Sequence, residues 1–266
     1  MGLALGSGGA RGFAHLGVLR ALREAGVAPY CFAGTSMGAV VGAFAAAGKA
    51  EELETYVLSL DWPRIVRYGD VAWSLRQGGL LKGNVFHQQL AQRLGAATFA
   101  DLRMPFAAVA TDVESGQRVV MRSGDLALAV RASASIPGLF APVRFAGTWL
   151  IDGAFTDPVP VGEARALGAE KVVAIDVSPE VSRAAPRGGR PGVKDILLQA
   201  MSIAEAGLAG GGACAPQGVE LVGLLHHLDA EGHVAVRAAV AAAGGAPLYE
   251  ELVGTGTQGD GECYDK

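Results

Sequence analysis

Two patterns of hydrophobic positions alternate along the chain. Short, nearly uninterrupted apolar runs such as "GLAL", "YCFAG" and "KVVAIDV" are typical of strands buried on both faces of a parallel sheet. Between them lie longer stretches whose apolar residues recur at helical spacing and which several times end in glycine. This β-α-β-α order predicts an α/β fold of three layers, in which helices cover both faces of a mostly parallel central sheet.

The pattern assigns each stretch to a strand or a helix. Strands are expected within residues 2–9, 30–36, 104–113, 116–122, 142–145, 148–152, 171–177 and 219–225. Helices are expected within residues 10–26, 37–48, 50–60, 84–95, 125–136, 158–169, 193–207 and 232–244. The spacing in the first helix predicts a buried face of Ala14, Val18, Ala21 and Ala25, with Leu22 beside it.

Three segments break this regular order. Residues 61–82 have poor periodicity but contain Trp62 and Trp73 among several arginines, so they form either a lid that meets lipid or an ordinary helical cap. Residues 178–192 are rich in Pro, Gly and Arg and are expected to be an exposed loop. We therefore expect one domain over residues 1–245, followed by a loosely held, polar and acidic tail at 246–266.

Composition and charge exclude several classes of protein. A length of 266 residues suits one large α/β domain, and a net charge of −4 does not favour a nucleic-acid partner. The three scattered cysteines include no CxxC pair, which argues against a disulfide framework or a thiolate metal site. The N-terminus lacks a signal-peptide layout, and no apolar run is long enough to span a bilayer. We expect a cytoplasmic protein whose contact with the inner membrane face, if any, is peripheral and transient.

The pentapeptide "GTSMG" lies where a predicted strand meets a predicted helix. A serine on such a sharp turn exposes its hydroxyl above the sheet, and Gly34 and Gly38 relieve the crowding around it. The helix after this turn directs its N-terminal amides toward the same place. Ser36 is therefore a candidate nucleophile, and the alternative is a tight turn with an N-capping serine.

The earlier stretch "LGSGGARG" is a glycine turn at the start of another helix. The dinucleotide pattern G-x-G-x-x-G fails from Gly6 because Arg11 takes the third position, and it fails from Ser7 because the first glycine is missing. A P-loop matches still less well, because no Gly-Lys-Ser/Thr comes after the glycines. What remains is either a plain packing turn or an anion site made of backbone amides, and with Ser36 nearby the anion would be the oxyanion of an ester intermediate.

A serine nucleophile needs a base. The five histidines are His15, His87, His226, His227 and His233, and of these only the pair 226–227, after a late strand, has a placement like that of a hydrolase triad. In "WLIDGAF", Asp152 closes an apolar run and a glycine comes next, so its carboxylate could reach a neighbouring site without crowding. Asp152 is thus the better candidate base, and the alternative is an Asx turn or helix cap.

Three motifs now stand in order along the chain, at Gly8–Gly12, Gly34–Gly38 and Asp152–Ala154. In this order they resemble the patatin-like phospholipase family, with Ser7 as a mild departure where the family often has a third consecutive glycine. The stretches "ATDVESG" and "ASASIPGLFAPV" also resemble family blocks, and the resemblance runs from Gly2 to about Val177. It implies a Ser–Asp dyad that hydrolyses lipid esters without a metal or cofactor.

The favoured hypothesis is therefore a lipid acyl hydrolase of the phospholipase A or lysophospholipase type. Ser36 attacks the ester and Asp152 acts as the base, while Gly12, Gly34, Gly38 and Gly153 support the motifs. The amides expected to bind the oxyanion are those of Gly8, Gly9, Ala10 and Arg11.

Two alternatives stay open, and so does the oligomeric state. One is an α/β-hydrolase triad in which His226 or His227 acts with Asp176 or Asp152. The other is a non-catalytic nucleotide-binding or regulatory module that uses the glycine loop.

Overall fold

The computed structural model of the chain describes residues 1–59 and 79–177, a few positions between 199 and 208, and the backbone of two late strands. Most of the expected lid, the 178–192 loop and the 246–266 tail lie outside the described residues, as does most of the predicted helix at 193–207. The two long described ranges contain all three of the sequence motifs around Gly8, Ser36 and Asp152.

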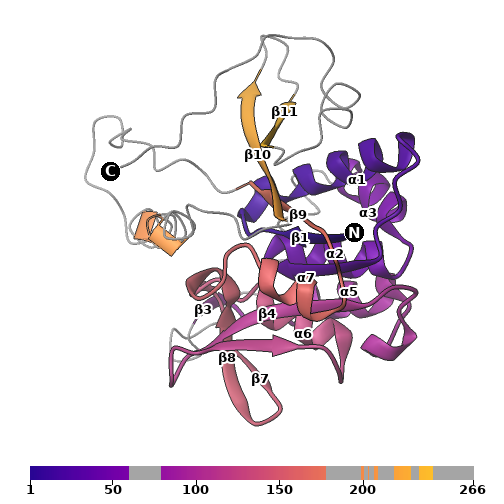
Figure 1. Ribbon diagram of the computed structural model, residues 1–266. Helices are drawn as coiled ribbons and strands as arrows, with labels where there is room; N and C mark the ends of the chain where they lie inside the picture. The colour runs from indigo at the N-terminus through magenta and orange to yellow at the C-terminus, as the bar shows by residue number, and fades with distance from the viewer. Residues whose placement is uncertain are drawn as a thin grey trace.

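The sheet has nine strands in the order β11-β10-β9-β1-β2-β4-β8-β7, and β5 also pairs with β4 (Figure 1). Its middle is parallel, as predicted, and is made of β1 (Gly2–Leu5), β2 (Cys31–Thr35), β4 (Phe106–Asp112), β9 (Val172–Asp176) and β10 (Val219–Leu228). Antiparallel strands extend it: β5 (Arg118–Met121), β7 (Val143–Phe145), β8 (Thr148–Asp152) and β11 (Val234–Ala241). Two short strands, β3 (Gly79–Leu81) and β6 (Gly138–Phe140), form a separate parallel pair.

Side chains alternate between the two faces of the sheet, and helices cover both. Leu3, Leu5 and Phe32 belong to the larger core, which also contains residues of α1, α2, α3, α5 and α6, while Ala4 and Ala33 belong to a smaller core with α7. The helices are α1 (Ala14–Glu24), α2 (Met37–Ala46), α3 (Ala50–Leu58), α5 (Asn84–Leu94), α6 (Leu126–Ser133) and α7 (Val161–Ala166). The three-layer α/β fold predicted from the sequence is confirmed.

The helix predicted for residues 10–26 needs correction on two points. The first turn of the predicted helix at 10–26 is a separate 3-10 segment, η1 (Gly9–Phe13), and α1 begins after it. Of the predicted buried face, Leu22 is buried and Ala14 and Val18 pack against the core, but Ala25 is exposed, and the buried side also carries His15 and Leu16, which were not predicted. Histidine is polar and does not count toward an apolar stripe, yet this imidazole is buried because it hydrogen-bonds to the carbonyl of Gly6.

The helix predicted for residues 232–244 is wrong. This segment contains β11, which pairs with β10 from Leu221↔Ala241 to Leu228↔Val234 at one edge of the sheet (Figure 1). Its alanines favour a helix, but Val234, Val236 and Val240 alternate with other residues at the spacing of a strand, and pairing with β10 outweighs the local propensity.

One absence bears on membranes. Among the helices that the structure describes, none combines the length and hydropathy needed to cross a bilayer.

Candidate active site

Ser36 occupies a strained turn between β2 and α2. Its φ of 56° and ψ of −121° lie in a region that non-glycine residues rarely adopt. A Cβ at position 34 would lie 2.4 Å from the carbonyl oxygen of Gly38, and a Cβ at position 38 would lie 2.1 Å from that of Leu5. Both glycines of "GTSMG" are therefore required by close backbone approach, and the turn packs directly on the end of β1.

Asp152 ends β8, next to β4, and its carboxylate meets Ser36. The Ser36 hydroxyl donates to Oδ2 of Asp152 at 2.6 Å, and the two residues are 2% and 0% exposed. The amide of Ala154 donates to the other carboxylate oxygen at 2.9 Å, which fixes the orientation of the carboxylate. A Cβ at position 153 would lie 2.3 Å from the carbonyl oxygen of Val109, so only glycine fits after this aspartate.

The glycine loop lies against the same turn. A Cβ at Gly12 would lie 2.4 Å from Cβ of Met37, the residue directly after Ser36, so η1 packs directly on the start of α2. The loop needs glycine conformations at Gly8 (φ 148°) and Gly9 (φ 55°). It lies beside Ser36 because β1 and β2 are parallel neighbours whose carboxyl ends meet at one edge of the sheet.

The amides of this loop differ in what they bind. Among residues 1–59 and 79–177, no backbone carbonyl accepts from the amides of Gly8, Gly9 or Ala10, and a Cβ at Gly9 would have nothing within 4 Å. The amide of Arg11, in contrast, donates to the carbonyl of Gly8 at 3.1 Å. The loop therefore offers amides that donate to no backbone carbonyl of the described ranges, with open space at Gly9, but the amide of Arg11 is already used within the turn.

His15 is buried against the start of the glycine loop. Its Nε2–H donates to the carbonyl of Gly6 at 2.8 Å, while Nδ1 is buried with no partner among the described residues. Burial lowers the pKa of His15 to about 4, although the hydrogen bond to Gly6 and the charge of Asp176 act in the opposite direction. The ring is therefore neutral at physiological pH. The late pair His226 and His227 lies in β10, beyond the register that β10 shares with β9.

Ser133 holds Ser36 in place and was not identified as a site residue from the sequence. The amide of Ser36 donates to Oγ of Ser133 at 2.9 Å, and that hydroxyl donates to the carbonyl of Val109 at 2.5 Å. The amide of Asp152 donates to the carbonyl of Ser135 at 3.0 Å. Both serines lie in "ASASIPG", a stretch that the sequence marked only as resembling a family block.

An apolar cavity of about 270 Å³ has in its wall Met37, the residue directly after Ser36. Its wall contains Met37, Val40 and Phe44, which lie on one side of α2, and Phe13 at the end of η1. The rest of the wall comes from α3, α5 and the β3–β6 pair: Leu53, Tyr56, Val57, Leu81, Phe86, Gln89, Leu90, Arg93 and Phe140. Its volume is close to the lower end of the range of small-molecule pockets, and the lining suits a hydrocarbon chain.

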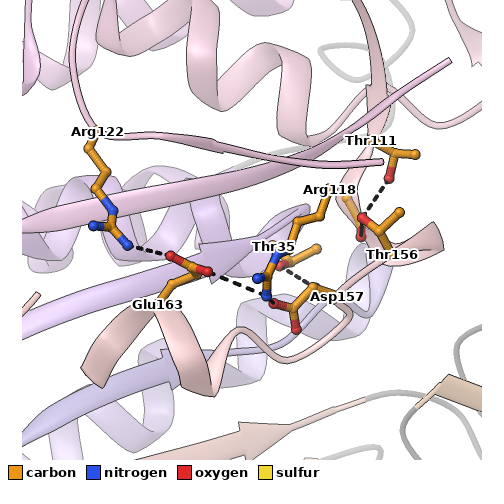
Figure 2. A network of polar contacts seen from close by, with 8 residues as sticks. Thr35, Thr111, Arg118, Arg122, Thr156, Asp157 and Glu163 are labelled. Atoms are coloured by element: carbon orange, nitrogen blue, oxygen red, sulfur yellow. Dashed lines mark hydrogen bonds and ion pairs between the residues drawn. The ribbon is translucent and has the colours of Figure 1, made fainter. Parts of the chain in front are cut away.

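A polar network holds the chain after Asp152 (Figure 2). Arg118 of β5 donates to the carboxylate of Asp157 at 2.7 Å and lies 3.3 Å from that of Glu163, which also binds Arg122. The hydroxyl of Thr35, next to the nucleophile, donates to the backbone carbonyl of Asp157 at 2.8 Å. Burial raises the pKa of Asp157, and the contact with Arg118 opposes this. The network ties the loop after Asp152 to both β2 and β5.

Within the described residues, no cluster of three or more His, Cys, Asp or Glu side chains is arranged to hold a metal ion.

The fold and site define an α/β protein with a serine on a strand–turn–helix elbow and a buried carboxylate in contact with it. The chain belongs to the patatin-like phospholipase family, whose model matches residues 3–165. Over 200 residues it is 39% identical to an uncharacterised NTE family protein of Mycobacterium tuberculosis, covering 75% of this chain and 54% of the relative.

Other similarities are more distant. The lysophospholipase nte1 of Aspergillus fumigatus is 30% identical over 192 residues, which cover 66% of this chain and 12% of that protein. The chain thus spans about half the length of the mycobacterial relative and a small part of the fungal one. The crystal structure of VipD from Legionella pneumophila aligns with a TM-score of 0.49 and 16% identity, over 84% of this chain and 60% of that chain.

Proposed function

We propose that this chain is a serine acyl hydrolase that cleaves carboxylic esters of lipids. The observation that carries the proposal is the 2.6 Å hydrogen bond from the hydroxyl of Ser36 to the buried carboxylate of Asp152, beside an apolar cavity. Membership of the patatin-like phospholipase family supports the same reaction.

The reaction takes the general course of covalent catalysis by two residues. Oγ of Ser36 attacks the ester carbonyl carbon, and its proton passes to Oδ2 of Asp152. The tetrahedral intermediate then collapses, the bond to the leaving alcohol breaks, and Asp152 returns the proton to that alcohol. Water attacks the acyl-enzyme in the same way, gives up its proton to Asp152, and releases the fatty acid while Ser36 is reprotonated.

The amides of Gly8, Gly9 and Ala10 are the proposed donors to the oxyanion. They donate to no backbone carbonyl of the described ranges, and Gly9 faces open space, whereas the amide of Arg11 already donates to the carbonyl of Gly8. Losing one such donor typically costs about 3–4 kcal/mol of transition-state stabilisation, so this loop would supply a large share of the rate enhancement.

The apolar cavity is the proposed site for the acyl chain. Met37 lies in its wall directly after Ser36, so an acyl chain bound there could place its ester carbonyl near Ser36. The proposed substrate is a single-chain lipid, and the fungal relative is named a lysophospholipase. Contact of residues 61–82 with a lipid surface stays a prediction, since residues 61–78 lie outside the described part of the chain.

The test uses a lysophospholipid and a short-chain p-nitrophenyl ester as substrates. Ser36→Ala and Asp152→Asn should each reduce hydrolysis of both substrates by a factor of about 1,000 or more, as expected when a member of a catalytic unit is lost. Ser115→Ala and Asp101→Asn are matched controls, because they make the same changes at exposed positions away from the site, and they should keep wild-type rates.

Two outcomes would contradict the proposal. Full activity in Ser36→Ala would remove the serine from the reaction. Saturable nucleotide binding by a wild-type protein without esterase activity would favour the regulatory module instead.

A further inference from the structure

We propose that Ser133 is a positioning residue that holds Ser36 and Asp152 in register for the reaction. This inference rests on the proposed function and adds to it a residue that contacts neither the substrate nor the proton in transit. Ser133 is the last residue of α6, is fully buried, and hydrogen-bonds both to Ser36, directly after β2, and to Val109 in the middle of β4.

The first contact fixes the nucleophile. The amide of Ser36 donates to Oγ of Ser133 at 2.9 Å, at the residue whose backbone lies in the strained region. Such a conformation persists only where surrounding contacts hold it. Without the hydroxyl, the buried amide of Ser36 would lose this acceptor and the turn would relax toward other conformations, which would move Oγ away from Asp152.

The second contact joins Ser133 to Val109, which packs against the residue after Asp152. The hydroxyl of Ser133 donates to the carbonyl of Val109 at 2.5 Å, and the same carbonyl oxygen lies 2.3 Å from where a Cβ of Gly153 would be. The backbone of Val109 therefore packs closely against Gly153, the residue after Asp152. The hydroxyl of Ser133 thus links Ser36 to β4, the strand that packs against Gly153 after Asp152. Ser36 and Asp152 themselves are 116 positions apart in the chain.

This arrangement also has a consequence for the oxyanion. In some serine hydrolases the amide of the nucleophilic residue itself donates to the oxyanion. Here that amide is committed to Ser133. The oxyanion must then rely on donors other than this amide, which agrees with the role proposed for the open amides of the glycine loop.

The test is a series of substitutions at position 133, read as kcat and KM separately on the p-nitrophenyl ester. Ser133→Ala should lower kcat by a factor of about 10 to 100, the scale of a small misplacement of reacting groups, and leave KM within about twofold because the acyl cavity is untouched. Ser133→Thr keeps a hydroxyl at the same place and should recover most of kcat. Ser133→Cys, with a weaker donor and acceptor, should fall between Thr and Ala.

A matched control separates positioning from a general loss of stability. Cys31→Ala removes a buried polar atom from the opposite end of β2, where Sγ donates to the carbonyl of Ala164. It should lower the melting temperature by a similar amount but keep the wild-type kcat. The rate of fluorophosphonate labelling of Ser36 should fall with kcat across the position-133 series and stay unchanged in Cys31→Ala.

A failure of the role of Ser133 and a failure of the proposed function would give different results. A Ser133→Ala protein with kcat within threefold of wild type, when Ser36→Ala is inactive, would overturn the role of Ser133 and leave the proposed function intact. An active Ser36→Ala protein would instead overturn the proposed function. If Ser133→Ala does not fold, the comparison of Ser133→Cys with wild type decides, and equal kcat values would again overturn the inference.

Discussion

At the scale of single residues, the central question is how a carboxylate serves as the base for Ser36. A carboxylate with a pKa near 4 is a weaker base in water than imidazole, whose pKa is about 6.5. Asp152 compensates by position, because its Oδ2 lies 2.6 Å from the serine hydroxyl and its other oxygen is held by the amide of Ala154. In the proposed reaction, the carboxylate of Asp152 therefore takes the serine proton directly, without the histidine that lies between serine and aspartate in a triad.

Arg11 is predicted to favour anionic substrates. Its side chain is exposed beside the glycine loop, and it forms no ion pair within the described part of the chain. Arg11→Gln should raise KM for an anionic lysophospholipid by about two- to fivefold at low salt, the usual scale of one exposed charge, and should leave hydrolysis of a neutral ester unchanged. Arg144→Gln, at an exposed arginine of β7, is the control. An equal KM for the anionic lipid in both variants would refute a role in binding the headgroup.

His15 is predicted to make stability depend on pH. Its pKa is about 4 in the folded protein and about 6.5 when exposed, so below pH 6.5 the unfolded chain takes up a proton that the folded protein does not. The free energy of unfolding should fall as the pH drops from 6.5 to about 4, by up to about 3 kcal/mol from this residue. Urea unfolding at pH 7, 6 and 5 measures the effect, and His15→Gln should reduce the slope. The same slope in both proteins would show that another group is responsible.

At the scale of elements, prediction from the sequence succeeded where the local chain determines the structure. The glycine patterns around Ser36 and after Asp152 imply close backbone contacts, and those contacts are present. The same reasoning failed for β11, whose strand conformation depends on β10, and it missed His15 on the buried side of α1, where the imidazole is held by its bond to Gly6. The role of Ser133 could not be predicted, because both of its partners are distant in the chain.

Helix α2 is predicted to control acyl-chain length. Val40 lies on the side of α2 that lines the cavity of about 270 Å³, and a phenylalanine there would fill part of that volume. Val40→Phe should lower kcat/KM for a dodecanoyl ester by about tenfold or more and change it little for an acetyl ester, because each buried methylene contributes about 0.8 kcal/mol. Leu58→Phe, on the exposed side of α3, should leave the preference unchanged. A uniform loss across all chain lengths would place the acyl chain elsewhere.

At the scale of the whole molecule, the sheet brings the site together. Strand β4 lies between β2, which carries Ser36 at its end, and β8, which ends in Asp152. The glycine loop comes from β1 on the other side of β2. All three motifs therefore meet in neighbouring strands, while β10, with His226 and His227, lies three strands away from β2 in the order of the sheet.

This order predicts that the late histidines are dispensable. The double variant His226→Gln/His227→Gln should keep kcat within about threefold of wild type on the short-chain ester, because the hydroxyl of Ser36 already donates to Asp152. Its circular dichroism spectrum serves as the control for folding. A loss of activity as large as that of Ser36→Ala, in a folded protein, would favour the triad.

Catalysis by Ser36 and Asp152 is tested most directly by covalent labelling of the wild type and Asp152→Asn with a fluorophosphonate, followed by mass spectrometry of the peptides. We expect one adduct, on Ser36 of the wild type, and a rate at least about 1,000-fold lower in Asp152→Asn, because the asparagine cannot take the proton from the hydroxyl. An adduct on a different residue, or equal labelling rates in the two proteins, would contradict a reaction carried by Ser36 and Asp152.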